Sequence, residues 1–159
     1  MRIPIVNEKD EIIAIKERDK VAQEDVYRVS SLWITNSKKE ILLARRALNK
    51  RNDPGKWGPA VAGTVEENET YESNIIKEAE EEIGLKNLKP VLDLKLRSTS
   101  KHNYFVQRFL VIIDRDISEF KVQKDEVAEI KWFTPEELIK ELKEHPDDFL
   151  KGIHERMNL

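Results

Sequence analysis

The sequence predicts a mixed α/β fold of the α+β type, in which helices pack against one sheet. Short segments rich in β-branched and aromatic residues alternate with segments of helical periodicity, and turn residues separate them. No internal repeat, low-complexity linker or Pro/Gly/Ser-rich boundary divides the 159 residues. Because a chain of this length forms one core, we expect a single domain over residues 1–159.

The first half of the chain predicts two β-hairpins and a further strand. Four apolar, β-prone segments occur in two pairs around polar turns, namely residues 3–6 with 12–15 and residues 26–35 with 40–45. The first pair predicts an extra hairpin within about residues 1–25. After the turn signal Asp53-Pro54-Gly55, residues 59–65 predict a short strand that leads into a helix.

The second half predicts three strands and a helical end. Residues 91–98 and 104–113 favour an antiparallel pair, and residues 127–133 favour a final strand. Thr134-Pro135-Glu136-Glu137 is typical of a helix start, with Thr as N-cap, Pro at the first helical position and Glu three residues after the cap. We expect a C-terminal helical segment over about residues 134–157, interrupted near Pro146.

Composition limits the classes of partner and of chemistry. Lys and Arg number 28 against 31 Asp and Glu, and a net charge of −3 gives no reason to expect a nucleic-acid partner. No apolar run approaches the length of a membrane span and no leader pattern is present, so we expect a cytoplasmic protein without a membrane partner. Cys is absent, which excludes disulfides, thiolate metal sites and thiol nucleophiles.

The segment between the first and second halves predicts an amphipathic helix. Ile75, Ile76, Ala79 and Ile83 fall on one stripe at about 100° per residue, so one face of the helix is buried. Thr70 is placed to cap the start, and Gly84 to terminate the last turn. Glu78, Glu81 and Glu82 are neighbours at i, i+3 and i+4 beside the buried stripe.

Three convergent carboxylates repel one another unless a positive charge lies between them. Mg²⁺ prefers carboxylate oxygens together with waters and substrate phosphates, and Mn²⁺ is an alternative ion. The patch therefore indicates a divalent-metal site that activates water against a diphosphate. Taken alone, the three carboxylates favour a solvated acidic helix face over a catalytic site.

The wider segment is more specific. Residues 63–85 read G-T-V-E-E-N-E-T-Y-E-S-N-I-I-K-E-A-E-E-E-I-G-L, which resembles the Nudix box G-x5-E-x7-R-E-U-x-E-E-x-G-U, where U is aliphatic. The resemblance implies a Nudix-like α/β/α sandwich with a mixed β-sheet, and Mg²⁺-dependent cleavage of a phosphoanhydride bond. The implied substrate is a nucleoside diphosphate linked to another moiety, or a related organic pyrophosphate.

The resemblance also implies roles for single residues. Glu78, Glu81 and Glu82, together with Gly63, bind the metal ions, and the three carboxylates are catalytic. Glu69, Lys77 and Gly84 support the motif, with Lys77 in the place of the usual Arg, whose fork fixes a carboxylate by two hydrogen bonds that an ammonium does not reproduce. The general base is either Glu78 or Glu126, which lies just before the last predicted strand.

Two further features are candidates for substrate binding. Arg45 and Arg46 begin a basic run that continues to Lys50 and Arg51, and guanidinium forks match phosphate oxygens. Trp57 follows the Pro54-Gly55 turn and offers a flat ring for stacking on a nucleobase.

Outside the box the chain resembles the Nudix branch that contains isopentenyl-diphosphate isomerase. The likeness extends from about residue 6 to residue 138 and is carried by Val6-Asn7-Glu8, Ser30 to Trp33, Arg45-Arg46-Ala47-Leu48 and Pro54-Gly55-Lys56-Trp57. The residues of the isomerase reaction are replaced, however. Ala62 occupies the position of its Cys, Thr64, Lys20 and Tyr27 those of its His residues, and the segment around its later Glu reads Phe105-Val106-Gln107.

Three functions therefore remain open. The first is a pyrophosphohydrolase acting on a small-molecule nucleotide or diphosphate, which the complete set of box carboxylates favours. The second is an isomerase-like enzyme acting on a prenyl diphosphate, and the third is a non-catalytic nucleotide-binding module, which Lys77 keeps open. A homodimer is a further expectation, because the extra N-terminal hairpin offers a surface for pairing.

Overall fold

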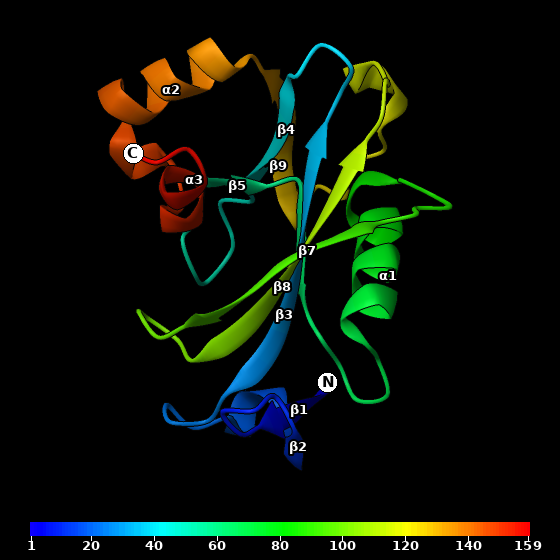
Figure 1. Ribbon diagram of the computed structural model, residues 1–159, viewed down its shortest axis with the longest axis vertical. Coiled ribbons are helices and arrows are strands. Elements are labelled where there is room, and N and C mark those ends of the chain that lie inside the picture. Colours follow the sequence, from blue (N-terminus) through cyan, green and yellow to red (C-terminus); the bar gives the residue numbers. More distant parts are fainter.

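A computed structural model describes residues 1–159, and it confirms a mixed sheet with helices and a separate N-terminal hairpin (Figure 1). The strands are β1 (Arg2–Val6), β2 (Ile12–Glu17), β3 (Tyr27–Thr35), β4 (Ile41–Arg46), β5 (Trp57–Pro59), β6 (Val61–Thr64), β7 (Val91–Ser98), β8 (Tyr104–Ile112) and β9 (Val127–Phe133). The α-helices are α1 (Tyr71–Ile83), α2 (Pro135–Glu144) and α3 (Lys151–Arg156), and the 3₁₀ helices are η1 (Arg18–Lys20), η2 (Ile117–Glu119) and η3 (Pro146–Asp148). None of the helices has the length and apolar character needed to cross a membrane.

The large sheet has seven strands, and its central pair is parallel. The main path runs β5-β4-β3-β8-β7, while β6 pairs with β3 and β9 pairs with β4. Strands β3 and β8 are parallel along their whole length, and the other pairs are antiparallel. Both predicted hairpins and the predicted pair of residues 91–98 with 104–113 are confirmed.

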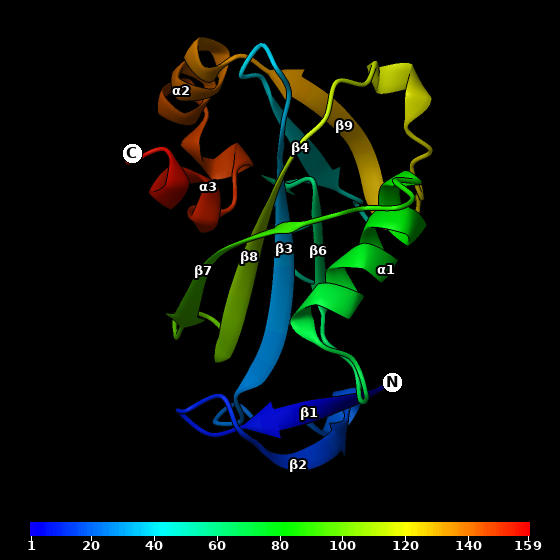
Figure 2. The ribbon, with the colours of Figure 1, turned by 45° about the vertical axis from the view of Figure 1, so that its right-hand side comes forward.

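Helix α1 covers one face of this sheet, and α2 with α3 covers the other at one end (Figure 2). The core under α1 consists of Leu32, Ile34, Leu42, Ala60, Val61, Ile75, Ala79, Ile83, Leu85, Leu88, Phe109 and Phe120. The core under α2 and α3 consists of Trp33, Ile41, Leu43, Phe133, Leu138, Leu142, Phe149 and Ile153. Alternate residues of β3 enter the two cores, which is the period of a strand buried on both faces.

The strand predicted over residues 59–65 is present as β6, but it is shorter than predicted, and a separate strand, β5, ends at Pro59. Strand β5 pairs with β4, whereas β6 pairs with β3, and Ala60 separates them. Strands β3 and β4 share only two registered residue pairs, Ile34 with Leu42 and Thr35 with Ile41. Beyond these pairs the two strands diverge and take different partners. This divergence opens the sheet next to α1.

The N-terminal hairpin is fixed to the sheet and to α1 through the carboxylate of Asp10, whose side chain is only 9% exposed. Arg28 Nε donates a hydrogen bond of 2.8 Å to Asp10 Oδ1. Tyr71 Oη and Lys95 Nζ donate hydrogen bonds of 2.9 and 2.7 Å to Asp10 Oδ2. One acidic group of the hairpin thus satisfies three donors from β3, α1 and β7.

Asp10→Asn will lower the free energy of unfolding at pH 7 by about 2 kcal/mol, because a carboxamide leaves charged donors without a charged acceptor. Asn tolerates the positive φ of 59° at this position, so the turn itself is kept. Urea unfolding measures the change. Asp19→Asn, on the exposed helix η1, is the matched control and will stay within about 0.5 kcal/mol of the wild type.

The effect will depend on pH in a definite direction. Burial opposes ionisation of Asp10, but the hydrogen bonds from Lys95, Arg28 and Tyr71 outweigh it and lower the pKa of this carboxyl in the folded protein. The stabilisation is therefore complete above an unfolded-state pKa of about 4 and is lost as the pH falls through the folded value. A wild-type–variant difference that stays constant from neutral pH down to pH values below this range would contradict the account.

Candidate active site

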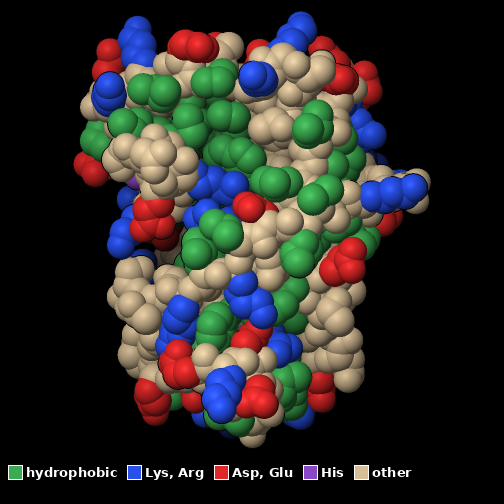
Figure 3. All heavy atoms as spheres, viewed as in Figure 1, with side chains coloured by type: hydrophobic (Ala, Val, Ile, Leu, Met, Phe, Trp, Pro, Cys, Tyr) green, Lys and Arg blue, Asp and Glu red, His purple; other side chains and the backbone are tan.

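Where β3 and β4 separate, residues of both strands line a large cleft of about 1540 Å³. Figure 3 shows the surface hollowed between α3 and the turn joining β7 to β8, with Lys, Arg, Asp and Glu side chains around the hollow. Of the residues predicted for the site, the cleft brings together Arg45, Arg46, Gly63, Glu78, Glu81, Glu82 and Glu126. Residues far apart in the sequence, from four different segments, therefore face one space.

Helix α1 begins and ends as its sequence predicts. The side chain of Thr70 accepts a hydrogen bond of 3.0 Å from the backbone N–H of Ser73, and the Ser73 hydroxyl accepts one of 2.9 Å from the N–H of Thr70. Gly84 ends the helix in the left-handed conformation at a φ of 69°, which glycine adopts without steric cost. With both ends and the apolar stripe fixed, the rotation of the helix about its axis is fixed too.

This rotation leaves Glu78 half-buried at the cleft and Glu81 exposed at its edge. Burial, together with the negative charges of Glu81, Glu69 and Glu66, raises the pKa of Glu78 to about 7 against the opposing charge of the neighbouring Lys77. The carboxylates therefore lie close enough to disfavour one another's charge.

Glu82 is the more strongly perturbed carboxyl. Burial and the charges of Glu78 and Glu126 raise its pKa to about 8, against the opposing effects of the Ala62 backbone and of the positive charge of Lys50. The structure thus brings Glu126, from the segment before β9, beside the helix carboxylates. Glu126 itself forms an ion pair with Lys50.

Lys77 lies at the centre of an ion-pair cluster behind the cleft. Its Nζ is 2.6 Å from Glu66 Oε2, 2.7 Å from Glu69 Oε2 and 3.7 Å from Glu78 Oε1. An ammonium in this position contacts three carboxylates as a point charge, where the Arg usual in the Nudix-box pattern would offer a planar fork. Burial opposes the charge of Lys77, but these ion pairs outweigh it and raise its pKa.

Asn74 is a site residue that the sequence analysis missed. It is fully buried on α1, and its amide donates hydrogen bonds of 3.1 Å to the carbonyl of Thr64 and to Glu69 Oε1. The hydroxyl of Ser30 on β3 donates to its Oδ1. The available signal was a polar residue beside the apolar stripe, since a buried carboxamide requires such partners.

Gly63 on β6 lies directly under side chains of α1. A Cβ at this position would be 2.5 Å from Glu78 Cγ and 3.1 Å from Asn74 Oδ1. Only a residue without a side chain allows the Glu78 side chain to pass over the strand. The carbonyl oxygen of Gly63 is the one ligand atom that this residue offers to a metal.

The predicted substrate residues divide into two groups. Arg45 and Arg46 line the cleft, where Arg45 Nε is 3.5 Å from Glu129 Oε1 and Arg46 Nε donates a hydrogen bond of 3.0 Å to the carbonyl of Asn52. Trp57 lies outside the residues that line the cleft. Its ring packs edge-on against Phe133, with 5.2 Å between centroids, in the core under α2 and α3.

The donor set fits a hard divalent cation. Partly buried, mutually repelling carboxylate oxygens beside an open cleft are ligands of the kind that Mg²⁺ and Mn²⁺ bind. Glu78, Glu81, Glu82 and Gly63 would hold such an ion. In this structure, three ligand atoms lie within 4.8 Å of one another only in Glu141, Glu144 and His145, at the end of α2 outside the cleft, so an ion would have to draw the cleft carboxylates together.

Comparison with known proteins agrees with the motif and with the fold. Residues 26–152 match the family model of the NUDIX domain. The chain belongs to the Nudix family. Among its relatives is a Salmonella typhi protein named "Uncharacterized Nudix hydrolase YfcD", 30% identical over 157 residues that cover 95% of this chain and 82% of the relative.

Other relatives connect the chain to the isomerase branch of the Nudix family. An isopentenyl-diphosphate Delta-isomerase from Kocuria rhizophila is 32% identical over 126 residues, which cover 75% of this chain and 68% of the relative. Among solved structures, DR0079 from Deinococcus radiodurans superposes with a TM-score of 0.84 at 22% identity, covering 99% of this Nudix chain and 98% of its own. This last likeness shows that the whole fold, the N-terminal hairpin included, is shared.

Proposed function

We propose that this Nudix protein is a Mg²⁺-dependent pyrophosphohydrolase. Its proposed substrate is a nucleoside diphosphate linked to another moiety, or a related organic pyrophosphate. The observation that carries the proposal is the gathering of Glu78, Glu81, Glu82 and Glu126 in one cleft with the cationic side chains of Arg45 and Arg46. Acidic groups suited to a metal and basic groups suited to phosphates face the same space, as phosphoanhydride cleavage requires.

Each group has a proposed part in the reaction. When bound, Mg²⁺ supplies positive charge that neutralises diphosphate oxygens and makes water more acidic. The guanidinium groups of Arg45 and Arg46 hold phosphate oxygens and orient the anhydride bond. Glu78 or Glu126 accepts the proton of the attacking water, and both carboxylates lie beside Glu82. Lys77 positions Glu78 through its cluster with Glu66 and Glu69.

An isomerase activity is the second candidate, because the relatives include isopentenyl-diphosphate isomerases. Three positions argue against it. Ala62 and Thr64 line the cleft with side chains that carry no acid of suitable strength. The buried carboxamide of Gln107 donates to backbone carbonyls of Asp93 and Leu94, at 2.9 and 3.3 Å, and so is used within the sheet.

Product analysis over a panel of nucleoside di- and triphosphates, nucleotide sugars and isopentenyl diphosphate tests the proposal, with Mg²⁺ or with EDTA. We expect cleavage between phosphorus atoms that requires Mg²⁺. Solvent deuterium entering isopentenyl diphosphate would establish the isomerase instead. Mg²⁺-dependent binding of a nucleotide without any product would establish a binding module.

A further inference from the structure

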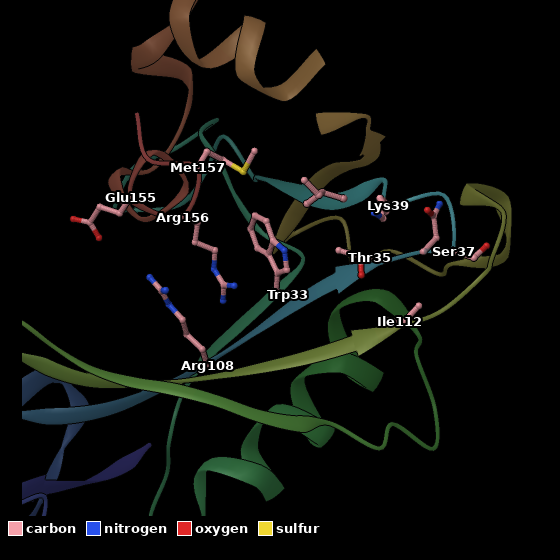
Figure 4. A pocket seen from close by; sticks show the side chains of 11 residues that line it. Trp33, Thr35, Ser37, Lys39, Arg108, Ile112, Glu155, Arg156 and Met157 are labelled. Carbon is pink, nitrogen blue, oxygen red and sulfur yellow. The ribbon is translucent and has the colours of Figure 1, made fainter. Parts of the chain in front are cut away.

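A second group of positive charges lies on the sheet face that α3 covers. Arg108 of β8 and Arg156 of α3 extend their side chains toward each other beside Trp33 of β3 (Figure 4). Both guanidinium groups line the active-site cleft, and both also line an adjoining hollow of about 600 Å³. The two positions are 48 residues apart in the sequence, and only the fold brings them together.

Arg156 is held in place before any ligand arrives. Its Cζ lies 4.3 Å from the centroid of the Trp33 ring, and its side chain is only 13% exposed. A guanidinium stacked on an indole is attracted to the face of the ring and loses little further freedom when it binds an anion. Trp33 is itself buried in the core under α2 and α3, so the platform is rigid.

The positive charges of this pair are only partly neutralised by protein groups. Arg156 Nη1 is 3.8 Å from Asp93 Oδ2, beyond hydrogen-bond distance, and none of the ion pairs in the structure involves Arg108. Burial and the charge of Arg108 lower the pKa of Arg156 to about 10. The exposed carboxylate of Glu155 on the same rim pairs with Lys151 instead, with 3.7 Å between Glu155 Oε1 and Lys151 Nζ.

We propose that Arg108 and Arg156 form an anion subsite that binds a phosphate group of the substrate remote from the anhydride bond. The subsite rests on the proposed function for its substrate, but its phosphate binding stands independently of turnover. Two guanidinium forks on one ligand match the oxygens of a phosphate. The cleft joins this pair to the carboxylates, and its 1540 Å³ exceeds what a diphosphate alone fills.

A subsite of this kind narrows the class of substrate that fits the cleft. An organic pyrophosphate that carries a further phosphate ester or a longer phosphate chain at its distal end satisfies both ends of the cleft. A pyrophosphate with a neutral distal group leaves Arg108 and Arg156 without a partner. Such compounds will have a higher KM than their phosphorylated counterparts, with a similar kcat.

Nuclear magnetic resonance of arginine Nε–H groups tests the subsite without any turnover. The signals of the pair are assigned by their loss in Arg108→Gln and Arg156→Gln, and inorganic phosphate is titrated in EDTA. We expect both signals to shift with one shared Kd, and Arg156→Gln to weaken the phosphate response of Arg108 about 10-fold or more. If Arg156→Gln does not fold, Arg156→Lys, which keeps the charge, replaces it in the same titration.

Arg115 is the matched control, since it stacks on Phe120 at 5.6 Å but lies outside both the cleft and the hollow. Its signal will not respond to phosphate. A response at Arg45 or Arg46 with none at Arg108 and Arg156 would overturn the subsite. If the pair responds while no compound is hydrolysed, the anion site stands but its assignment to a substrate fails together with the hydrolase proposal, so the two failures are distinguishable.

The kinetics of Arg156→Gln distinguish two roles of the subsite, namely binding a phosphate of the substrate and binding a separate regulatory anion. They are measured on compounds that the enzyme cleaves. A subsite for the substrate raises KM about 10-fold with kcat nearly unchanged, and only for compounds with the distal phosphate. An equal effect on compounds with and without that phosphate would overturn the assignment to the substrate.

Discussion

Glu82→Gln will reduce Mg²⁺-dependent turnover by about 10²–10³-fold, because an amide oxygen holds a divalent cation far less strongly than a carboxylate does. The substitution keeps the shape of the side chain. Burial and the charges of Glu78 and Glu126 raise the pKa of Glu82 to about 8, so near pH 7 in EDTA the amide resembles the protonated carboxyl and the Tm will not fall. Steady-state kinetics on a compound from the panel, together with thermal unfolding, measure both effects.

Glu80→Gln is the matched control for this experiment. Glu80 is on the same helix two residues away, but it is exposed and does not line the cleft. The same loss of one negative charge at this position will leave turnover within about twofold of the wild type, as expected for a surface substitution away from the site. Equal losses in the two variants would show that net charge alone, and not a metal ligand, governs turnover.

Gly63→Ala will reduce turnover by about 10²-fold through displacement of a site carboxylate, with a fall in Tm. The new methyl group would be 2.5 Å from Glu78 Cγ and 2.8 Å from Glu78 Cδ, so Glu78 must leave its position. A misplacement of about 1 Å at a reacting centre costs about that factor. Since Asn74 Oδ1 is only 3.1 Å away, the added methyl group also crowds the amide that links α1 to β6.

Gly152→Ala provides the control for an added methyl group. Gly152 lies in α3, and nothing lies within 4 Å of a Cβ built there. Ala favours a helix over Gly by about 0.5–1 kcal/mol, so this variant will be as stable as the wild type or more so. If Gly63→Ala were fully active, the observed position of Glu78 would not be needed for turnover.

Local features of the site could be predicted from the sequence because local residues cause them. Thr70, the stripe that contains Ile75 and Ala79, and Gly84 together fix where α1 begins, how it rotates and where it ends. These features place Glu78 and Glu82 on one patch without knowledge of the rest of the chain. The same holds for α2, where Thr134 accepts the predicted cap hydrogen bond from Glu137 at 3.1 Å.

Features that depend on distant partners could not be predicted. The chain leaves one strand and begins another at Ala60 because β5 pairs with β4 whereas β6 pairs with β3. No pattern within residues 59–65 indicates this change of partner. Trp57 packs on Phe133 only because β4 pairs with both β5 and β9. The meeting of Arg108 with Arg156 likewise requires the position of α3 over the sheet.

The central claim is that the carboxylate patch of α1 binds a divalent metal ion. A Mn²⁺ titration monitored by electron paramagnetic resonance tests it most directly, because the titration needs no knowledge of the substrate. The free-ion signal of Mn²⁺ will decrease when wild-type protein or Glu80→Gln is added, and the decrease will be largely lost with Glu82→Gln. Competition by Mg²⁺ will restore the signal. Equal Mn²⁺ binding by wild-type protein and Glu82→Gln would contradict the assignment of this carboxylate patch as the metal site.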